Sequence, residues 1–358
     1  MSRVVRKYEN LIAFHPGYYL RELIESLDMT RDEFSRRMGV SSKTVSEIVN
    51  GNQNMSIDIA DRISNMTGTS IDLWLNLQKE YDKKVLEIEN LIQLEEDKKI
   101  LKQIDFNYIK NMFDLDSFSD INLKIKRLKE IFQISSLNVL KKPNLIVSFR
   151  NPSGKFEDKN VINSNIMLQI AKEKAKNIEV SKFNKKKLIA SLNKILSLNL
   201  EEPEYVYKKL SELLRDCGIA FVLLPHLKNS GINGAVTKIN KDKIMLLLSD
   251  RNKYADIFWF SLFHELGHII NGDFKVSMVD GDRDECESKA DEFAKNRLID
   301  QDEFKKFIKQ GDFSKEAILN FSNKNKIQPG ILLGRLQAEK FVKYGYLNYL
   351  KTKYKAVA

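Results

Sequence analysis

The spacing of apolar residues in the first quarter of the chain predicts a series of short helices. In each segment apolar side chains recur every three or four positions, as they do on the buried face of a helix. Thr30 and Glu33 form a capping box that begins the second helix, and Gly39 ends it. Ser41 or Ser42 then caps the third helix. The expected helices cover residues 17–27, 31–38, 42–49, 57–66 and 71–83.

The pattern changes further along the chain. Residues 84–141 stay mostly helical and fit a connector helix, a dimerising coiled coil or part of the next domain. From Pro143 onward, apolar runs typical of strands alternate with helical stretches. We therefore expect an α+β, mostly helical protein with domains at 1–83, 84–141 and 142–358. The expected strands are residues 144–149, 219–224 and 243–249, and the expected helices are residues 164–176, 184–197, 203–216, 255–271 and 284–298.

Length and composition favour folded domains over disorder. The chain has 358 residues, of which 42% are hydrophobic, so two to three domains can each bury a core. Its longest apolar run, near residues 257–263, is far shorter than the roughly 20 residues of a membrane helix. The N-terminus lacks the apolar segment of a signal peptide, and two cysteines are too few for a disulfide framework. We expect a cytoplasmic protein with no membrane partner.

The net charge of +10 suggests an anionic partner such as nucleic acid, but the charge is unevenly distributed. Residues 1–83 sum to −1, whereas residues 121–200 sum to +12. The basic segment fits a flank for bound DNA, a contact for an acidic partner or a solvated face. Net charge alone therefore does not identify a DNA-binding domain.

Residues 264–268 read HELGH, which places two histidines one helical turn apart. On a helix, His264 and His268 project from one face and can bind one metal ion, with Glu265 beside them as a proton acceptor. The chain has only four histidines, so this motif uses half of them. The competing interpretation is a core helix whose histidines make local hydrogen bonds. A third ligand would distinguish the two interpretations.

A candidate third ligand lies in the segment ECESKADEFA, on a second expected helix. Glu287 completes a set of two histidines and one glutamate with an open fourth position, as in catalytic zinc sites. Asp291, four residues later, can accept the other ring N–H of a liganding histidine. We therefore expect one Zn²⁺ per chain. Zinc would activate water and polarise a carbonyl, and Glu265 would pass the proton to the leaving amine.

Other residues are candidates for binding a peptide substrate. Asn233, Gly234 and Ala235 are expected to form either an edge strand that aligns an extended peptide or an ordinary hairpin edge. Tyr254 is a candidate oxyanion stabiliser by its position. His226, which follows an expected strand, either assists the site or is a loop histidine.

The motif HELGH together with E-x-x-A-D-x-F-A (287–294) resembles the ImmA/IrrE family of zinc metallopeptidases. The resemblance extends from about residue 142 to IQPGILLGRLQ (327–337), and it implies a minimal gluzincin-like fold with a small sheet packed on the active-site helices. Family members are implicated in cleaving DNA-bound repressors or antitoxins, so the resemblance implies regulatory proteolysis. The residues that it implies are the zinc ligands His264, His268 and Glu287 and the catalytic base Glu265.

One departure from that family concerns packing. The second motif usually ends in a Leu-Met-Pro-like stretch, and here it continues as Arg297-Leu298-Ile299-Asp300. The proposed ligands are unaffected.

Residues 14–82 are similar to the Cro/C1-type (XRE) helix-turn-helix domain of HigA-like antitoxins. The pattern of Gly39, Val40, Ser42, Val45 and Gly51 carries this similarity. It implies that residues 42–49 form the recognition helix, that operator DNA is a partner and that a homodimer reads paired half-sites. The implied contacts are Arg36 and Arg37 near phosphates, with Ser42, Lys43, Thr44 and Glu47 towards the major groove.

These features together predict a DNA-binding regulator fused to a zinc peptidase that acts on a repressor, an antitoxin or the chain itself. Two alternatives remain open. In the first, the protein is a HigA-like antitoxin and repressor with a toxin partner and a metal site that is not catalytic. In the second, it is a protein-binding scaffold.

Overall fold

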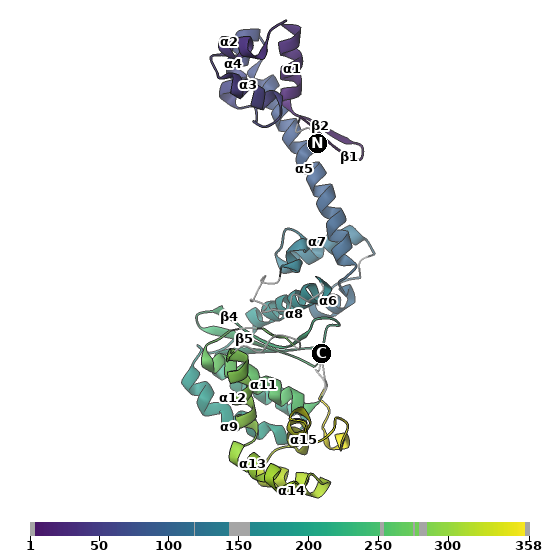
Figure 1. The fold of residues 1–358 in the computed structure, drawn as a ribbon, viewed down its shortest axis with the longest axis vertical. Coiled ribbons are helices and arrows are strands. Elements are labelled where there is room, and N and C mark those ends of the chain that lie inside the picture. The colour runs from purple at the N-terminus through teal and green to yellow at the C-terminus, as the bar shows by residue number, and fades with distance from the viewer. Residues whose placement is uncertain are drawn as a thin grey trace. The chain divides into compact units, whose positions relative to one another are not determined.

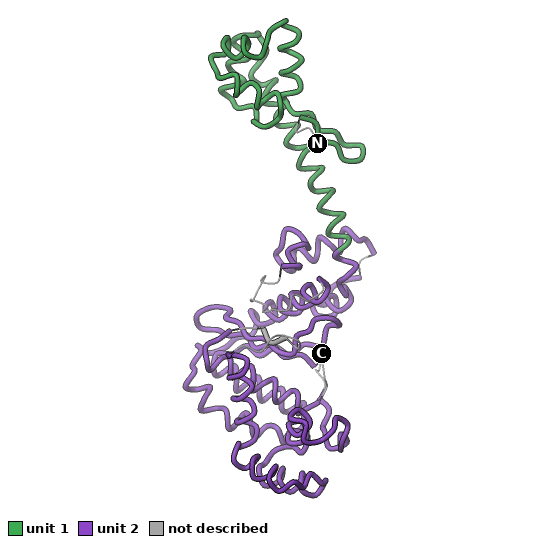
Figure 2. Tube along the Cα trace, viewed as in Figure 1, with its two compact units in different colours: residues 1–99 green, residues 100–358 purple. Residues whose placement is uncertain are grey.

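The computed structural model describes residues 4–354 except 118, 143–157, 251–253, 275 and 279–284. The chain divides into two compact units, residues 1–99 and residues 100–358 (Figure 2). Its described part contains fifteen α-helices and two small sheets, which confirms the α+β, mostly helical class (Figure 1). No helix in this part is long and apolar enough to cross a membrane.

The first unit contains a hairpin and five helices, the last of which continues past the unit boundary. The helices begin at the capping residues read from the sequence: the Thr30 side chain accepts a hydrogen bond from the Glu33 N–H, and Ser41, not Ser42, caps the third helix. Their apolar faces enclose one core that includes Phe34, Ile48 and Trp74. The elements are β1 (Val5–Tyr8), β2 (Leu11–Phe14), α1 (Pro16–Ser26), α2 (Arg31–Met38), α3 (Ser42–Val49), α4 (Ile57–Thr67) and α5 (Ile71–Leu101).

Helix α5 is much longer than the sequence pattern suggested. It was expected to end near residue 83, but it continues to Leu101. No glycine or proline occurs between Ile71 and Leu101, so nothing in the backbone ends the helix earlier. The hairpin β1–β2 was also not expected, because its two strands have only four residues each. It packs on α5 through Ala13, Tyr81 and Ile88.

His15 links the hairpin to α1 and is fully buried. Its Nδ1 caps α1 by accepting a hydrogen bond of 2.9 Å from the Gly17 N–H. Burial lowers the pKa of His15 below its ordinary value, although the nearby Asp82 carboxylate opposes this shift. The fold therefore favours the neutral imidazole, which is the form that can accept at Nδ1.

We predict that the first unit loses stability as the pH falls below the ordinary histidine pKa of 6.5. The unfolded chain then binds a proton that folded His15 resists, so the free energy of unfolding decreases from pH 7 to pH 5. Loss of the cap itself costs about 0.5–2 kcal/mol. His15→Asn keeps a capping oxygen but does not titrate, and it should flatten this pH dependence in urea unfolding. If the free energy of unfolding of His15→Asn depends on pH as steeply as that of the wild type, the prediction is wrong. His226→Asn is the control and should keep the wild-type pH dependence.

The second unit is built on a four-stranded sheet in the order β3-β5-β4-β6. Strand β5 runs parallel to β3 and antiparallel to β4, and β4 is antiparallel to β6. Helix α8 (Asp158–Asn177) packs on one face of the sheet and α11 (Ala255–Asn271) on the other (Figure 1). Strands β3 and β5 are almost wholly buried, which explains their continuous apolar sequences. The strands are β3 (Ile219–Leu224), β4 (Ile232–Asn240), β5 (Lys243–Ser249) and β6 (Val276–Met278).

Helices around the sheet match the expected positions to within a few residues, except that α8 begins earlier. The expected strand 144–149 lies outside the described residues. The helices are α6 (Phe106–Phe113), α7 (Ile121–Phe132), α8 (Asp158–Asn177), α9 (Lys185–Ser197), α10 (Pro203–Asp216), α11 (Ala255–Asn271), α12 (Glu285–Leu298), α13 (Gln301–Gln310), α14 (Lys315–Asn325) and α15 (Pro329–Ala338). The second unit also contains short 3₁₀ helices at Leu137–Lys141, Leu198–Leu200 and Asn348–Leu350.

Candidate metal centre

Helix α11 holds both histidines of the HELGH motif in the interior of the second unit. His264, Glu265 and His268 are 7%, 1% and 0% exposed, respectively. The helix is buried on nearly all sides, with Trp259 and Phe263 among its largest core residues. Such packing fixes the helix and thereby the directions of the two imidazoles.

Helix α12 brings a carboxylate to the same point. Glu287 Oε2 lies 3.1 Å from His264 Nε2, and Glu287 Oε1 lies 3.3 Å from His268 Nε2. The two Nε2 atoms are 3.0 Å apart. A Cβ at Gly267, within the motif, would lie only 3.3 Å from the Ala290 Cα, so this glycine lets α12 approach α11 closely.

The donor set formed by His264, His268 and Glu287 fits a zinc ion. One ligand atom from each residue lies within 4.8 Å of the others. Ligand atoms held by a tetrahedral zinc with bonds of about 2.0–2.2 Å would lie roughly 3.3–3.6 Å apart, slightly farther than the separations of 3.0–3.3 Å seen here. Two neutral imidazoles and one carboxylate also make up a common catalytic zinc set.

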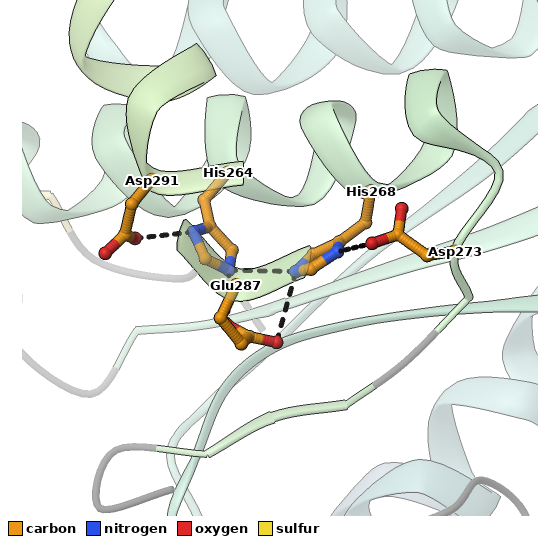
Figure 3. A network of polar contacts seen from close by, with 5 residues as sticks. All are labelled: His264, His268, Asp273, Glu287 and Asp291. Atoms are coloured by element: carbon orange, nitrogen blue, oxygen red, sulfur yellow. Dashed lines mark hydrogen bonds and ion pairs between the residues drawn. The ribbon is translucent and has the colours of Figure 1, made fainter. Parts of the chain in front are cut away.

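Two further carboxylates bind the outer nitrogens of the histidines (Figure 3). Asp291 Oδ1 lies 2.9 Å from His264 Nδ1, the arrangement expected from the sequence. Asp273 Oδ2 lies 3.0 Å from His268 Nδ1 and was not foreseen. The pair Gly272-Asp273 directly follows the motif helix, but this dipeptide alone does not predict the contact. Both histidines therefore direct Nε2 towards Glu287.

The carboxylates stabilise positive charge at the histidine nitrogens. Burial alone would lower the pKa of His264, but its hydrogen bonds to Asp291 and Glu287 outweigh burial and raise the pKa to about 10. The pKa of His268 is also raised, because hydrogen bonds to Glu287 and Asp273 and the charge of Glu265 outweigh its burial. The same contacts lower the pKa of Glu287 despite its burial. A divalent cation supplies the positive charge that this cluster favours.

Glu265 faces strand β4 and does not belong to the ligand cluster. A Cβ built on Gly234 would lie 2.5 Å from Glu265 Oε1 and 2.7 Å from its Cγ, so the carboxylate packs directly against the backbone of β4. The absence of a side chain at Gly234 is therefore what makes room for Glu265. Gly234 is a candidate substrate-binding residue from the sequence, but the sequence does not predict its contact with Glu265.

Gly234→Ala is predicted to destabilise the second unit by about 1–3 kcal/mol, because the new methyl group would overlap the Glu265 side chain. All three of the nearest atoms belong to Glu265. The cost should therefore largely disappear in a Glu265→Ala background, which a double-mutant cycle of urea unfolding would measure. Equal costs in both backgrounds would show that the contact with Glu265 is unimportant.

Residues 233–235 do not form the expected edge strand, because β4 has a neighbouring strand on each side. Strand β4 pairs with β5 on one side and with β6 on the other, where Gly234 opposes Ser277 and Ala235 opposes Val276. The register shifts at Asn233, so this residue lies at a bulge. The outer strand on this side is β6, which is too short to stand out in the sequence.

Tyr254 and His226 do not join the cluster. Tyr254 occupies the N-cap position of α11 without a side-chain capping hydrogen bond, ten residues before His264, or about 15 Å along a helix axis. It lines a small cavity with Asn233 and Ser261, and its role as an oxyanion stabiliser stays a prediction. His226 follows β3, and its backbone N–H donates to Asp250 Oδ1 at 2.7 Å, as suits a loop residue.

In the first unit, the expected DNA-contacting residues lie on α2 and α3. Ser42 and Lys43 are exposed in the first turn of α3, whereas Thr44 and Glu47 are half-buried. The Thr44 hydroxyl lies 2.9 Å from that of Ser41. Arg36 and Arg37 are exposed at the end of α2; Arg36 Nε donates to the Asp32 carbonyl, and Arg37 forms an ion pair of 2.5 Å with Glu33.

Comparison with known proteins identifies two domains. A family model described as helix-turn-helix matches residues 20–74, and a peptidase M78 model described as an IrrE N-terminal-like domain matches residues 230–328. Both resemblances read from the sequence are thus confirmed. The chain belongs to the helix-turn-helix transcriptional regulators and carries an IrrE-like domain in its second unit.

Individual relatives match a limited part of the chain. The uncharacterized HTH-type transcriptional regulator YbaQ of Escherichia coli K12 is 32% identical over 78 residues, which cover 22% of this chain and 67% of YbaQ. Virulence-associated protein I of Dichelobacter nodosus is 32% identical over 76 residues, 21% of this chain and 70% of that protein. The structure of Pseudomonas aeruginosa antitoxin HigA with the higBA promoter is 34% identical, covers 24% of this chain and 92% of HigA, and has a TM-score of 0.22.

Proposed function

We propose that this protein is a DNA-binding transcriptional regulator whose second unit is a zinc metallo-endopeptidase acting on a regulatory protein. The observation that carries the proposal is the convergence of His264, His268 and Glu287, with the buried Glu265 on the same helix. The match to an IrrE-like peptidase model supports it. The substrate class is a repressor, an antitoxin or the chain itself.

The proposed chemistry assigns a separate task to each group. His264, His268 and Glu287 would hold the zinc, which lowers the pKa of a coordinated water and polarises a carbonyl. Glu265, adjacent in sequence to His264, would take the proton of the attacking water and deliver it to the leaving amine. Asp291 keeps His264 in the tautomer that presents Nε2. The contact of Glu265 with Gly234 places the base next to the sheet.

A peptide library derived from a bacterial proteome would test the proposed hydrolysis. The zinc-loaded protein should generate new peptide termini that mass spectrometry detects, and the chelator-treated protein should not. Restoring zinc to the treated protein should restore cleavage. Termini that form equally with and without the chelator would point to a contaminating protease and against the proposal.

The first unit is proposed to bind operator DNA as a homodimer, with α3 in the major groove. The support is the family match over residues 20–74 and the exposure of Ser42 and Lys43 at the start of α3. Helix N-termini of this kind contact base edges, while nearby arginines contact phosphates. Arg36 and Arg37 are suited to phosphates because both are exposed.

Arg36→Gln is expected to weaken binding to the protein's own promoter and to reduce the slope of log K against log salt by about 1. The reason is that each neutralised phosphate releases condensed counterions. Fluorescence anisotropy over a series of salt concentrations would measure this slope. Lys315→Gln, an exposed substitution in the second unit, is the control. An unchanged slope for Arg36→Gln would exclude Arg36 as a phosphate contact.

A further inference from the structure

Asp273 occupies a position that the sequence motifs do not explain. It follows the C-terminus of α11, outside the HELGH motif, and its Oδ2 lies 3.0 Å from His268 Nδ1. Its side chain is only 16% exposed. We infer that Asp273 is a positioning residue that fixes the tautomer and ring orientation of His268 for metal binding; this inference rests on the proposed zinc site.

The end of the helix delivers this carboxylate to the imidazole. Gly272 caps α11 in the left-handed conformation, with φ +82°. The His268 carbonyl accepts hydrogen bonds from both following amides, Gly272 N–H at 2.9 Å and Asp273 N–H at 3.1 Å. The left-handed turn therefore folds Asp273 back over the last turn of α11, where its side chain meets the ring of His268. A glycine adopts such a φ without the steric cost that a Cβ would bring.

The burial of Asp273 supports a role in the metal site over a role in stability alone. Among the described residues, its Oδ1 is buried and has no hydrogen-bond partner. A carboxylate this buried is unfavourable unless positive charge lies close by. The ring of His268, held between Asp273 and Glu287, supplies that charge when a cation binds at Nε2.

The chain contains a matched control for Asp273. Helix α13 also ends in a left-handed glycine, Gly311 with φ +70°, and the next residue is again an aspartate, Asp312. Asp312 is exposed, and its Oδ1 accepts from the Ser314 N–H, far in sequence from either histidine. Two Gly-Asp pairs, each with a left-handed glycine at the end of a helix, thus differ in whether the carboxylate reaches a histidine.

Competition against a chromogenic zinc chelator would test the inference on the full-length protein. Asp273→Ala should weaken zinc binding by about 10–100-fold, the usual cost of losing such a partner. Asp273→Asn retains an oxygen acceptor and should recover part of that loss. Asp312→Ala should bind zinc as the wild type does. Binding by Asp273→Ala within twofold of the wild type would overturn the inference.

A second readout separates positioning from folding. The chain has four histidines, so ¹⁵N-histidine labelling gives four imidazoles that single substitutions can assign. With zinc bound, His268 of the wild type should show a single form protonated at Nδ1, and Asp273→Ala should show mixed forms while His264 is unchanged. An unaltered His268 signal in Asp273→Ala would overturn the inference. If the wild type itself binds no zinc, the proposed zinc peptidase function is wrong. That result differs from one in which the wild type binds zinc and Asp273→Ala binds it equally well, which would overturn only the inference about Asp273.

Discussion

Glu265→Gln is expected to reduce the rate of peptide cleavage by about 10²–10⁴-fold, the contribution of a positioned general base. Glutamine has nearly the same shape, so it fits against Gly234, but its amide cannot take a proton from water. Zinc content and operator binding should therefore stay at wild-type levels. Cleavage assays on the peptides identified with the wild type, together with metal analysis, would measure these effects.

The matched control for this substitution is Glu292→Gln on α12, which makes the same chemical change at an exposed position. It should retain full activity. Cleavage by Glu265→Gln at more than about a tenth of the wild-type rate would be far above what loss of a general base allows. Glu265 would then be a structural residue.

His264→Ala should lower zinc content from about one ion per chain to nearly none, because two remaining ligands rarely hold zinc. The substitution also removes the imidazole that lies 3.1 Å from Glu287 Oε2 and 2.9 Å from Asp291 Oδ1, while Glu287 keeps its contact with His268. Loss of the metal also removes its stabilisation, which reaches about 2.7 kcal/mol when free zinc is 100 times the dissociation constant. Metal analysis after dialysis and thermal unfolding with and without added zinc would measure both effects.

The control for the metal prediction is His226→Ala, which removes a histidine from a loop outside the cluster. It should retain one zinc per chain. Zinc content unaffected by His264→Ala would mean that the ion binds elsewhere, and the assignment of the cluster would be wrong.

Local patterns in the sequence were enough to locate the candidate metal-binding cluster. His264 and His268 are one turn apart on a single helix, and Glu287 and Asp291 are one turn apart on the next. Helical periodicity therefore predicts which side chains share a face. Local signals of the same kind predicted helices of the first unit; for example, Thr30 caps the start of α2 and Gly39 ends it.

Features that depend on tertiary structure were not predictable in this way. The contact between Gly234 and Glu265 joins a strand to a helix, and nothing near either residue signals it. The pairing of β6 with β4 depends on a three-residue strand. The reach of Asp273 depends on the left-handed turn at Gly272, and the identical Gly311-Asp312 pair shows that the dipeptide alone does not imply it.

The distribution of charge shows why domain patterns were more informative than composition. The net charge of +10 suggests nucleic acid, yet residues 1–83, which contain the helix-turn-helix match, sum to −1. The spacing of apolar residues and caps, not the charge, identified that domain. We propose that its affinity for DNA comes from a few placed side chains and from dimerisation, and the salt dependence of the Arg36 variant examines the contribution of one such side chain.

The most direct test of the proposed function is a comparison of protein termini in cells that express either the wild type or Glu265→Gln at equal levels. Mass spectrometry should reveal at least one regulatory protein, or this chain itself, with new termini that appear only with the wild type. If the two cell populations yield the same termini under conditions in which the purified protein holds zinc, the metal site is not catalytic. The protein would then be a transcriptional regulator with a structural metal.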